Sequence, residues 1–573
     1  MSSTWEKEPQ RPADPEVAAP YWGQSLLLSV DSPSGDMKAV LRESTIKGEE
    51  KQFLEIWHKN RKLKCLNLTT LSKHGKVYED DQFGCMVWSH SETHLLYVAE
   101  KKRPKTESYF QGLETGLLAD EEETIKTDKE ETVLAFWSPS DTGLVFVGWW
   151  HEPFRLGLKY CANRRSSLFY VDLASGKCEQ LSSNSSAVCS PRLSPDHCRI
   201  VYMECGIFGP HQQCNRLCMY DWYTKQTSVV VDVVQRARED GFTGIYSSML
   251  SSRCWSADSQ RVLMSCAQRC RKDLLVVDTS TGEVTSLTSR IVRGGQLEFA
   301  EYSQRSDGGQ LLFTKLPSRP AGLDFNAILL KPKEMTAGSK LPLVVMPHGG
   351  PHSVLVSEWI LSTAVLCKMG FSVLLVNYRG SLGFGQDNIL SLPGNIGTQD
   401  VKDVQFAVDS VLKQGDFDEQ KVAVVGGSHG GFLACHLIGQ YPEFYKACVA
   451  RNPVTNLSSM IGCTDIPDWC VVEAGYEYNT DIHLEPAILE QMLNKSPIKH
   501  VSKVKTPVLL MLGEDDKRVP SKQGIEYYRA LKALQVPVRL LWYPGNNHSL
   551  SKVDAESDGF MNAALWIIQH LSL

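Results

Sequence analysis

The sequence predicts two domains of different class: a β-propeller, complete or not, followed by an α/β domain built on a parallel sheet. One observation is a repeated pattern of short strands that begins near residue 37. A second is a change, after residue 318, to apolar runs that alternate with amphipathic helices. A third is a glycine-rich turn, 426-GGSHGG-431, at the end of one such run. We therefore place the domains at 37–318 and 319–573 and expect 1–36 to be poorly structured.

The pattern that recurs in the first domain is a strand ending in Trp or Leu, a Ser-Pro-Asp-like turn and a second strand. Successive turn serines, Ser89, Ser138 and Ser194, are 49 and 56 residues apart, near the length of a four-stranded propeller blade. With interleaved hairpins the copies make about five blade-like units, and a stacked β-sandwich is the alternative. The copies are 87-VWSHSETHLLYV-98, 136-FWSPSDTGLVFV-147, 192-RLSPDHCRIVYM-203, 254-CWSADSQRVLM-264 and a weaker 302-YSQRSDGGQLLFT-314.

The second domain alternates strand-like runs with helical stretches. The best helical stretch, 400-DVKDVQFAVDSVLKQ-414, has apolar residues spaced so that they form one face. Such an alternation predicts an open parallel sheet covered on both sides, with a ligand site at the carboxyl ends of its strands. The strand-like runs are 341-LPLVVMP-347, 371-FSVLLVNY-378, 422-VAVV-425, 445-YKACVA-450, 506-TPVLLML-512 and 537-PVRLLWY-543.

The glycine-rich turn fits the G-x-S-x-G nucleophile elbow with Ser428 at its centre. A serine hydroxyl needs a histidine to take its proton and a carboxylate to orient that histidine. In an α/β-hydrolase these groups follow in the order Ser, acid, His. Asp516 follows one predicted strand and His548 follows the last, so we expect both in the site; Asp515 and Glu514 are rivals for the acid.

A developing oxyanion also requires hydrogen-bond donors. One expected donor is the backbone N–H of His429, the residue after the nucleophile. The other is expected from the loop 346-MPHGGP-351, where Gly350 is our choice. The second domain is therefore predicted to be an α/β-hydrolase with serine-hydrolase chemistry.

Composition excludes several other classes. A net charge of −6 argues against nucleic acid as the main partner, and no apolar run is long enough to cross a membrane. The first 20 residues lack a secretory signal, and the 17 scattered cysteines suit reduced thiols, so we expect a cytoplasmic protein. The close pairs Cys214 with Cys218 and Cys266 with Cys270 lack companion ligands, so neither a metal nor a cofactor is expected.

The second-domain motifs make the resemblance specific. The chain resembles the acylaminoacyl-peptidase branch of the prolyl oligopeptidase family, in which a propeller precedes an α/β-hydrolase. The resemblance implies that Ser428 is the nucleophile, Asp516 the acid and His548 the base. It also implies a cofactor-free cytosolic peptidase, typically a homotetramer, that releases an N-acylated amino acid from short peptides. The motifs are 347-PHGGP-351, 377-NYRGSLGFG-385, 426-GGSHGGF-432, 451-RNPVTN-456, 464-TDIPDW-469, 513-GEDDKRVP-520 and 543-YPGNNHSL-550.

The first domain departs from this family. Vertebrate members carry seven blades, whereas sequence is missing here around 110–130 and 287–320, so the chain is expected to carry an incomplete or gapped ring. Two alternative functions stay open: a related serine aminopeptidase or esterase on the same scaffold, and a catalytically impaired binding scaffold. A dipeptidyl peptidase would need buried carboxylates for a free amine, and the obvious acidic cluster, near Glu122, is a solvated charge run.

Overall fold

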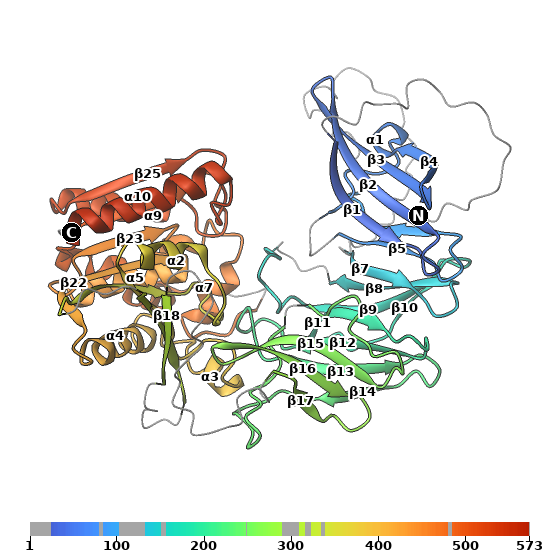
Figure 1. The fold of residues 1–573 in the computed structure, drawn as a ribbon, viewed down its shortest axis with the longest axis horizontal. Coiled ribbons are helices and arrows are strands. Elements are labelled where there is room, and N and C mark those ends of the chain that lie inside the picture. Colours follow the sequence, from blue (N-terminus) through green and yellow to red (C-terminus); the bar gives the residue numbers. More distant parts are fainter. Residues whose placement is uncertain are drawn as a thin grey trace.

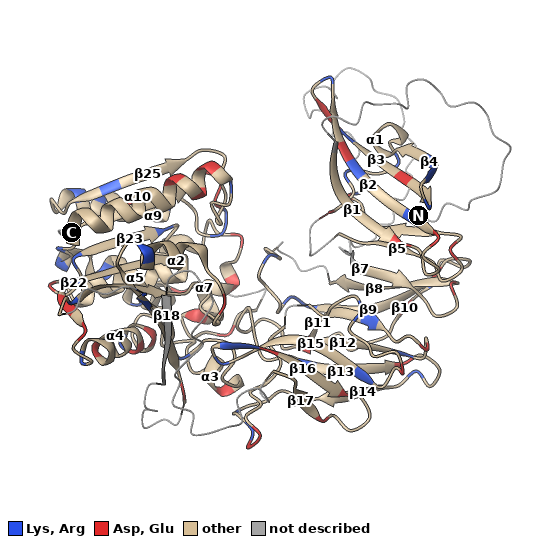
Figure 2. Ribbon diagram, in the orientation of Figure 1, with Lys and Arg blue, Asp and Glu red and all other residues tan. Residues whose placement is uncertain are grey.

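The computed structural model describes residues 24–79, 84–101, 132–150, 156–247, 249–288, 309–315, 323–333, 338–479 and 484–571. Within these residues the chain forms a series of small antiparallel sheets and then one large mixed sheet with helices on both faces (Figure 1). Acidic and basic residues are interspersed over both parts (Figure 2). In the described chain, no helix combines the length and the hydropathy needed to span a membrane.

The described residues of the N-terminal part form five separate sheets in chain order, β1–β4, β5–β6, β7–β10, β11–β14 and β15–β17. Five successive small sheets fit propeller blades and not the two stacked sheets of a sandwich. Their strands are β1 Gln24–Asp31, β2 Met37–Ile46, β3 Glu49–His58, β4 Arg61–Asn67, β5 Met86–Trp88, β6 Leu95–Tyr97, β7 Thr132–Trp137, β8 Gly143–Trp149, β9 Ser166–Asp172, β10 Cys178–Gln180, β11 Ala187–Leu193, β12 Arg199–Cys205, β13 Arg216–Asp221, β14 Thr227–Val231, β15 Arg261–Gln268, β16 Arg271–Asp278 and β17 Val284–Ser286, with the short helix α1 at Leu68–Leu71.

The repeated tryptophan explains how neighbouring sheets are joined. The Trp88 indole N–H donates to the carbonyl of Val30 at 3.3 Å, in the preceding sheet. Trp137 donates in the same way to Val87 at 3.2 Å, and Trp255 to Arg192 at 3.2 Å. An indole N–H that is withdrawn from water needs such a partner, so each of the three copies with a tryptophan is hydrogen-bonded to the preceding sheet.

Two expectations about the domain limits are wrong. Residues 24–31, placed in a poorly structured segment, form β1, and 30-VDSPSGDMKAVL-41 is a further copy of the strand-turn-strand pattern. The weak copy 302–314 is not a blade: its described part lies in β18 (Gly309–Lys315), which pairs with β19 (Asn326–Pro332) in the large C-terminal sheet. That sheet therefore begins before residue 319.

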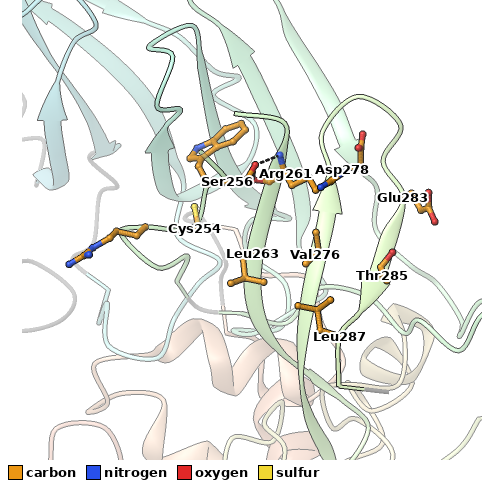
Figure 3. Close-up of a pocket in the computed structure, with 11 residues that line it drawn as sticks. Cys254, Ser256, Arg261, Leu263, Val276, Asp278, Glu283, Thr285 and Leu287 are labelled. Carbon is orange, nitrogen blue, oxygen red and sulfur yellow. Dashed lines mark hydrogen bonds between the residues drawn. The ribbon is translucent and has the colours of Figure 1, made fainter. Parts of the chain in front are cut away.

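The described small sheets form an open arc and do not close into a ring (Figure 1). The central strand β12 has buried residues on both faces, but β15 buries alternate residues and exposes the others. On that face Leu263 is 38% exposed and Leu287 is 47% exposed, beside a hollow of about 710 Å³ (Figure 3). The last described sheet thus presents to solvent a face that a following blade would cover in a ring.

The C-terminal sheet has eight strands in the order β18-β19-β21-β20-β22-β23-β24-β25, with β20 to β25 parallel. Each of the six predicted strand-like runs overlaps one of its strands, and the predicted helix 400–414 overlaps α4. The strands are β20 Leu341–Pro347, β21 Ser372–Asn377, β22 Phe417–Gly427, β23 Ala447–Arg451, β24 Val508–Gly513 and β25 Val538–Tyr543. The helices are α2 Leu361–Lys368, α3 Gln386–Leu390, α4 Gln399–Leu412, α5 His429–Gln440, α6 Leu457–Met460, α7 Pro467–Glu473, α8 Pro486–Asn494, a 3₁₀ helix at Pro497–Lys503, α9 Lys522–Ala533 and α10 Val553–Leu571.

Successive residues of the parallel strands enter two different cores. In β20, Leu343 and Val345 pack in the core that contains α4, α5 and α9, whereas Val344 packs in the core with α2 and α10. Because successive side chains of a strand point to opposite faces, the sheet is covered on both sides. The carboxyl ends of these strands face the N-terminal part, where Leu382 and Ile389 pack with its residues in one apolar cluster.

Candidate active site

Ser428 lies between β22 and α5 with backbone angles φ 58° and ψ −122°. This conformation is sparsely populated for a residue with a side chain and is typical of a nucleophile elbow. The flanking glycines are required by close approach: a Cβ on Gly426 would lie 2.0 Å from the Gly430 carbonyl oxygen. A Cβ on Gly430 would lie 2.5 Å from the Pro347 carbonyl oxygen. The glycine pattern therefore reflects the strand and helix passing in contact.

Asp516 and His548 lie in the loops after β24 and β25, and the structure brings them together. His548 Nδ1 is 2.6 Å from Asp516 Oδ2, and Asp516 Oδ1 accepts the backbone N–H groups of Arg518 and Val519, each at 2.9 Å. The Asp516 side chain is buried, whereas both rivals for the acid, Glu514 and Asp515, are exposed. The geometry thus selects Asp516.

A cavity of about 440 Å³ contains Ser428 and His548 and lies between the two parts of the chain. Tyr160, His211 and Tyr246 of the N-terminal part form one of its walls. The hydrolase part contributes an apolar wall that consists of Leu382, Val454, Met460, Ile466, Trp469 and Val519. The proposed nucleophile and base therefore face one enclosed space that both parts of the chain shape.

Of the two predicted oxyanion donors, Gly350 lines this cavity, and His429 directly follows Ser428, which also lines it. His429 is the first residue of α5, so its N–H has no acceptor within the helix. The His348 ring donates from Nδ1 to the Gly349 carbonyl at 2.7 Å. Because the Gly349–Gly350 peptide is planar and trans, the N–H of Gly350 points away from that carbonyl. The ring thereby fixes the direction of the Gly350 N–H.

Two buried contacts between a histidine and a carboxylate beside the site were not predicted. His429 Nε2 is 3.0 Å from Asp400 Oδ2, and His352 Nε2 is 3.0 Å from Glu473 Oε1. All four side chains are almost fully buried. A signal for Asp400 exists, because it precedes Val404 by four residues and so falls on the apolar face of α4. No sequence pattern links His352 with Glu473, which are 121 residues apart and are brought together by the fold.

The four cysteines weighed as metal ligands are buried and free. Cys214 and Cys266 pack in the apolar cluster at the junction of the two parts. Their near neighbours in sequence, Cys218 and Cys270, pack in two other clusters. Burial raises the pKa of the Cys266 thiol to about 11. Each thiol therefore behaves as a core side chain.

Two family descriptions match the chain. "Acylamino-acid-releasing enzyme, N-terminal domain" matches residues 18–133 and 127–293, and "Prolyl oligopeptidase family" matches residues 358–573. The acylamino-acid-releasing enzyme of Rattus norvegicus is 54% identical over 639 residues, covering 95% of this chain and 87% of the rat protein. The chain belongs to the acylamino-acid-releasing enzyme family. The enzyme of Arabidopsis thaliana is 32% identical, with 95% of this chain and 87% of the plant protein covered.

A solved structure shares the fold. A Pyrococcus horikoshii acylaminoacyl peptidase superposes with a TM-score of 0.65 at 17% identity, covering 95% of this chain and 87% of that one. The alignment with the rat enzyme also shows a difference in length. It includes 95% of the 573 residues of this chain, about 544, but extends over 639 positions. About 95 aligned positions (639 − 544) therefore have no residue in this chain, the size of roughly two blades of ~45 residues.

Proposed function

We propose that this chain is a serine peptidase that releases an N-acylated amino acid from the front of short peptides. The observation that carries the proposal is the 2.6 Å hydrogen bond from His548 to buried Asp516 at a cavity that Ser428 shares. Membership of the acylamino-acid-releasing enzyme family supports the substrate class.

In the proposed reaction Ser428 Oγ attacks the carbonyl carbon of the acylated residue while His548 Nε2 takes the hydroxyl proton. Asp516 holds the Nδ1 proton of His548 and stabilises the imidazolium that forms. The N–H groups of His429 and Gly350 bind the oxyanion of the tetrahedral intermediate. His548 then protonates the leaving amine, and water hydrolyses the acyl-enzyme by the same steps in reverse.

The cavity wall favours a neutral N-terminus. Among the described residues that line it, none is an aspartate or a glutamate, and Arg518 adds a positive charge. A free α-amine would therefore lose its hydration without gaining a carboxylate partner, which is costly. An acyl cap carries no such charge and suits the apolar wall. This contrast favours an acyl-peptide substrate over the dipeptidyl-peptidase and aminopeptidase alternatives.

Paired asparagine variants of two adjacent aspartates test the proposed catalytic residues. Asp516→Asn should lower kcat on an acetyl-alanyl anilide by about 10⁴-fold, because the amide favours the wrong His548 tautomer. Asp515→Asn is the matched control, since Asp515 is exposed. Equal activity of the two variants would reject the assignment of Asp516, and absence of turnover in the unmodified chain would support an impaired binding scaffold.

We further propose that the N-terminal part is a gapped propeller that admits longer peptides than a closed ring does. The exposed face of β15–β17 and the aligned positions without a counterpart support this proposal. A ladder of acetylated peptides of increasing length tests it, and a sharp length limit would contradict it. The expected homotetramer and cytoplasmic location stay predictions; light scattering measures the former.

A further inference from the structure

Asp468, in helix α7, is contacted by two side chains of the N-terminal part. Arg164 of the N-terminal part donates from Nη1 to Asp468 Oδ2 at 2.6 Å and from Nη2 to Oδ1 at 3.3 Å. His211, also of the N-terminal part, places Nε2 2.7 Å from the same Oδ2. The Asp468 side chain is fully buried and both partners are at most 9% exposed. The Asp468 carboxylate thus has three hydrogen-bond contacts with two side chains of the other domain. We call Arg164, His211 and Asp468 the interdomain clamp.

Ionisable groups surround this carboxylate. His211 Nδ1 lies 3.2 Å from the sulfur of Cys161, so each ring nitrogen has a hydrogen-bond partner. Burial opposes a charge on this ring, but Cys161 and Asp468 outweigh burial and raise the pKa of His211 to about 9. The same contacts hold the pKa of the Cys161 thiol below its ordinary value, against burial. These contacts favour the protonated His211 ring, whose Nε2–H donates to Asp468 in a charge-assisted hydrogen bond.

Helix α7 connects Asp468 with the proposed oxyanion donors. Trp469, the residue after Asp468, donates from its indole N–H to the Gly350 carbonyl at 3.1 Å. The Trp469 ring also meets the His429 ring edge to face, with centroids 6.0 Å apart. Trp469 therefore contacts both residues whose backbone N–H groups we assign to the oxyanion.

We propose that Arg164 and His211 of the N-terminal domain are positioning residues for the oxyanion donors and act through Asp468 and Trp469. The inference rests on the proposed function for the identity of those donors. It gives the N-terminal domain a part in the chemical step beyond covering the cavity. A domain joint that only holds the two parts together is the alternative, and it predicts lower stability with unchanged turnover per active site.

Arg164→Met tests the inference, because it removes both bonds to Asp468, together with the bond from Nε to the Gly157 carbonyl, and keeps an unbranched apolar side chain. Arg236→Met is the control: Arg236 Nε is 2.7 Å from Asp387 Oδ2, an ion pair between the same two parts that does not involve α7. Active sites are counted by fluorophosphonate titration, and kcat and KM are measured on an acetyl-alanyl anilide and on a p-nitrophenyl ester. The ester keeps the test valid if the proposed peptide specificity is wrong.

Arg164→Met should lower kcat per titrated site by about 10-fold to 10²-fold with little change in KM, as expected for a small displacement of catalytic groups. Arg164→Lys should restore part of the loss, because one donor to Asp468 returns. A kcat per site equal to that of Arg236→Met would overturn the inference, whatever the change in Tm. If Arg164→Met does not fold, His211→Gln provides the same comparison with a neutral side chain.

A double-mutant cycle tests whether the effect passes through the indole. Trp469→Phe removes the N–H that binds the Gly350 carbonyl and keeps an aromatic ring. If Arg164 acts through Trp469, Arg164→Met should cost clearly less in kcat in the Trp469→Phe background than in the wild-type background. Independent effects, with equal fold-losses in both backgrounds, would contradict the proposed route.

Discussion

Gly430→Ala adds one methyl group between the nucleophile helix and the strand that leads to the oxyanion loop. The new Cβ would lie 2.5 Å from the Pro347 carbonyl oxygen and 3.2 Å from that of His348. To approach ordinary van der Waals separation, about 3.5 Å, the end of β20 must retreat by roughly 1 Å. A displacement of ~1 Å at a catalytic group costs about 10² in rate, or ~2.7 kcal/mol.

The free energy of unfolding of Gly430→Ala reflects two opposing effects, the steric clash and the higher helix propensity of alanine. Alanine favours a helix interior over glycine by about 1 kcal/mol, whereas overpacking costs about 1–3 kcal/mol. Gly462→Ala is the control, because a Cβ there meets nothing within 4 Å. We expect kcat/KM on the acetyl-alanyl anilide to fall about 10²-fold for Gly430→Ala relative to Gly462→Ala. A value within twofold of the control would refute the argument that contact at Gly430 sets the oxyanion loop.

Three further outcomes are expected. Ser428→Ala should lower turnover by about 10⁶-fold and abolish fluorophosphonate labelling without lowering Tm; a labelled variant would contradict its role. Burial lowers the pKa of His348 and of His436 to about 3 each. Since both pKa values lie below the unfolded value, stability is complete above pH ~6.5 and is lost by about 1.4 kcal/mol per pH unit per histidine as pH falls toward 3. Urea titrations should show this slope, less steep in His436→Gln. Trp137→Phe should lower the free energy of unfolding by about 1 kcal/mol, through loss of the bond to Val87, and an unchanged midpoint in urea would contradict that.

Most of the C-terminal fold could be predicted because its signals are local. Each strand of the parallel sheet is a short apolar run bounded by glycine, proline or polar residues, and the elbow around Ser428 marks where one run ends. The order of serine, acid and histidine then assigns Asp516 and His548 to neighbouring strand ends. β18 was misassigned because its sequence, which follows the residues Ser-Asp-Gly, also fits a blade hairpin, and only its pairing with β19 assigns it to the large sheet.

The first sheet was missed for a related reason. In 32-SPSGDM-37 glycine occupies the turn position that is Glu92 or Asp141 in other copies. All three residues have positive φ, so the geometry is shared although the side chains differ. The expected count of about five units agrees with the five described sheets only because the missed first sheet offsets the misassigned copy 302–314. An incomplete ring was expected from the missing sequence, but the repeat does not specify how the first and last units lie, because that depends on contacts between them.

The interdomain clamp could not be predicted from sequence. Arg164 and Asp468 are 304 residues apart, and neither lies in a pattern that specifies a partner. The cavity wall formed by Tyr160, His211 and Tyr246 has the same origin, since it depends on how the two domains meet. Sequence motifs therefore locate the reacting groups, and the packing of the domains supplies the groups that orient them.

The ratio of kcat/KM for acetyl-alanyl and free alanyl anilides tests the central claim most directly. The two substrates differ only in the acyl cap, so the ratio measures how the cavity treats a charged amine. Without a carboxylate on the described wall, we expect the acetylated substrate to be favoured by about 10² or more. Equal rates on the two anilides, or faster cleavage of the free amine, would contradict an acyl-peptide specificity.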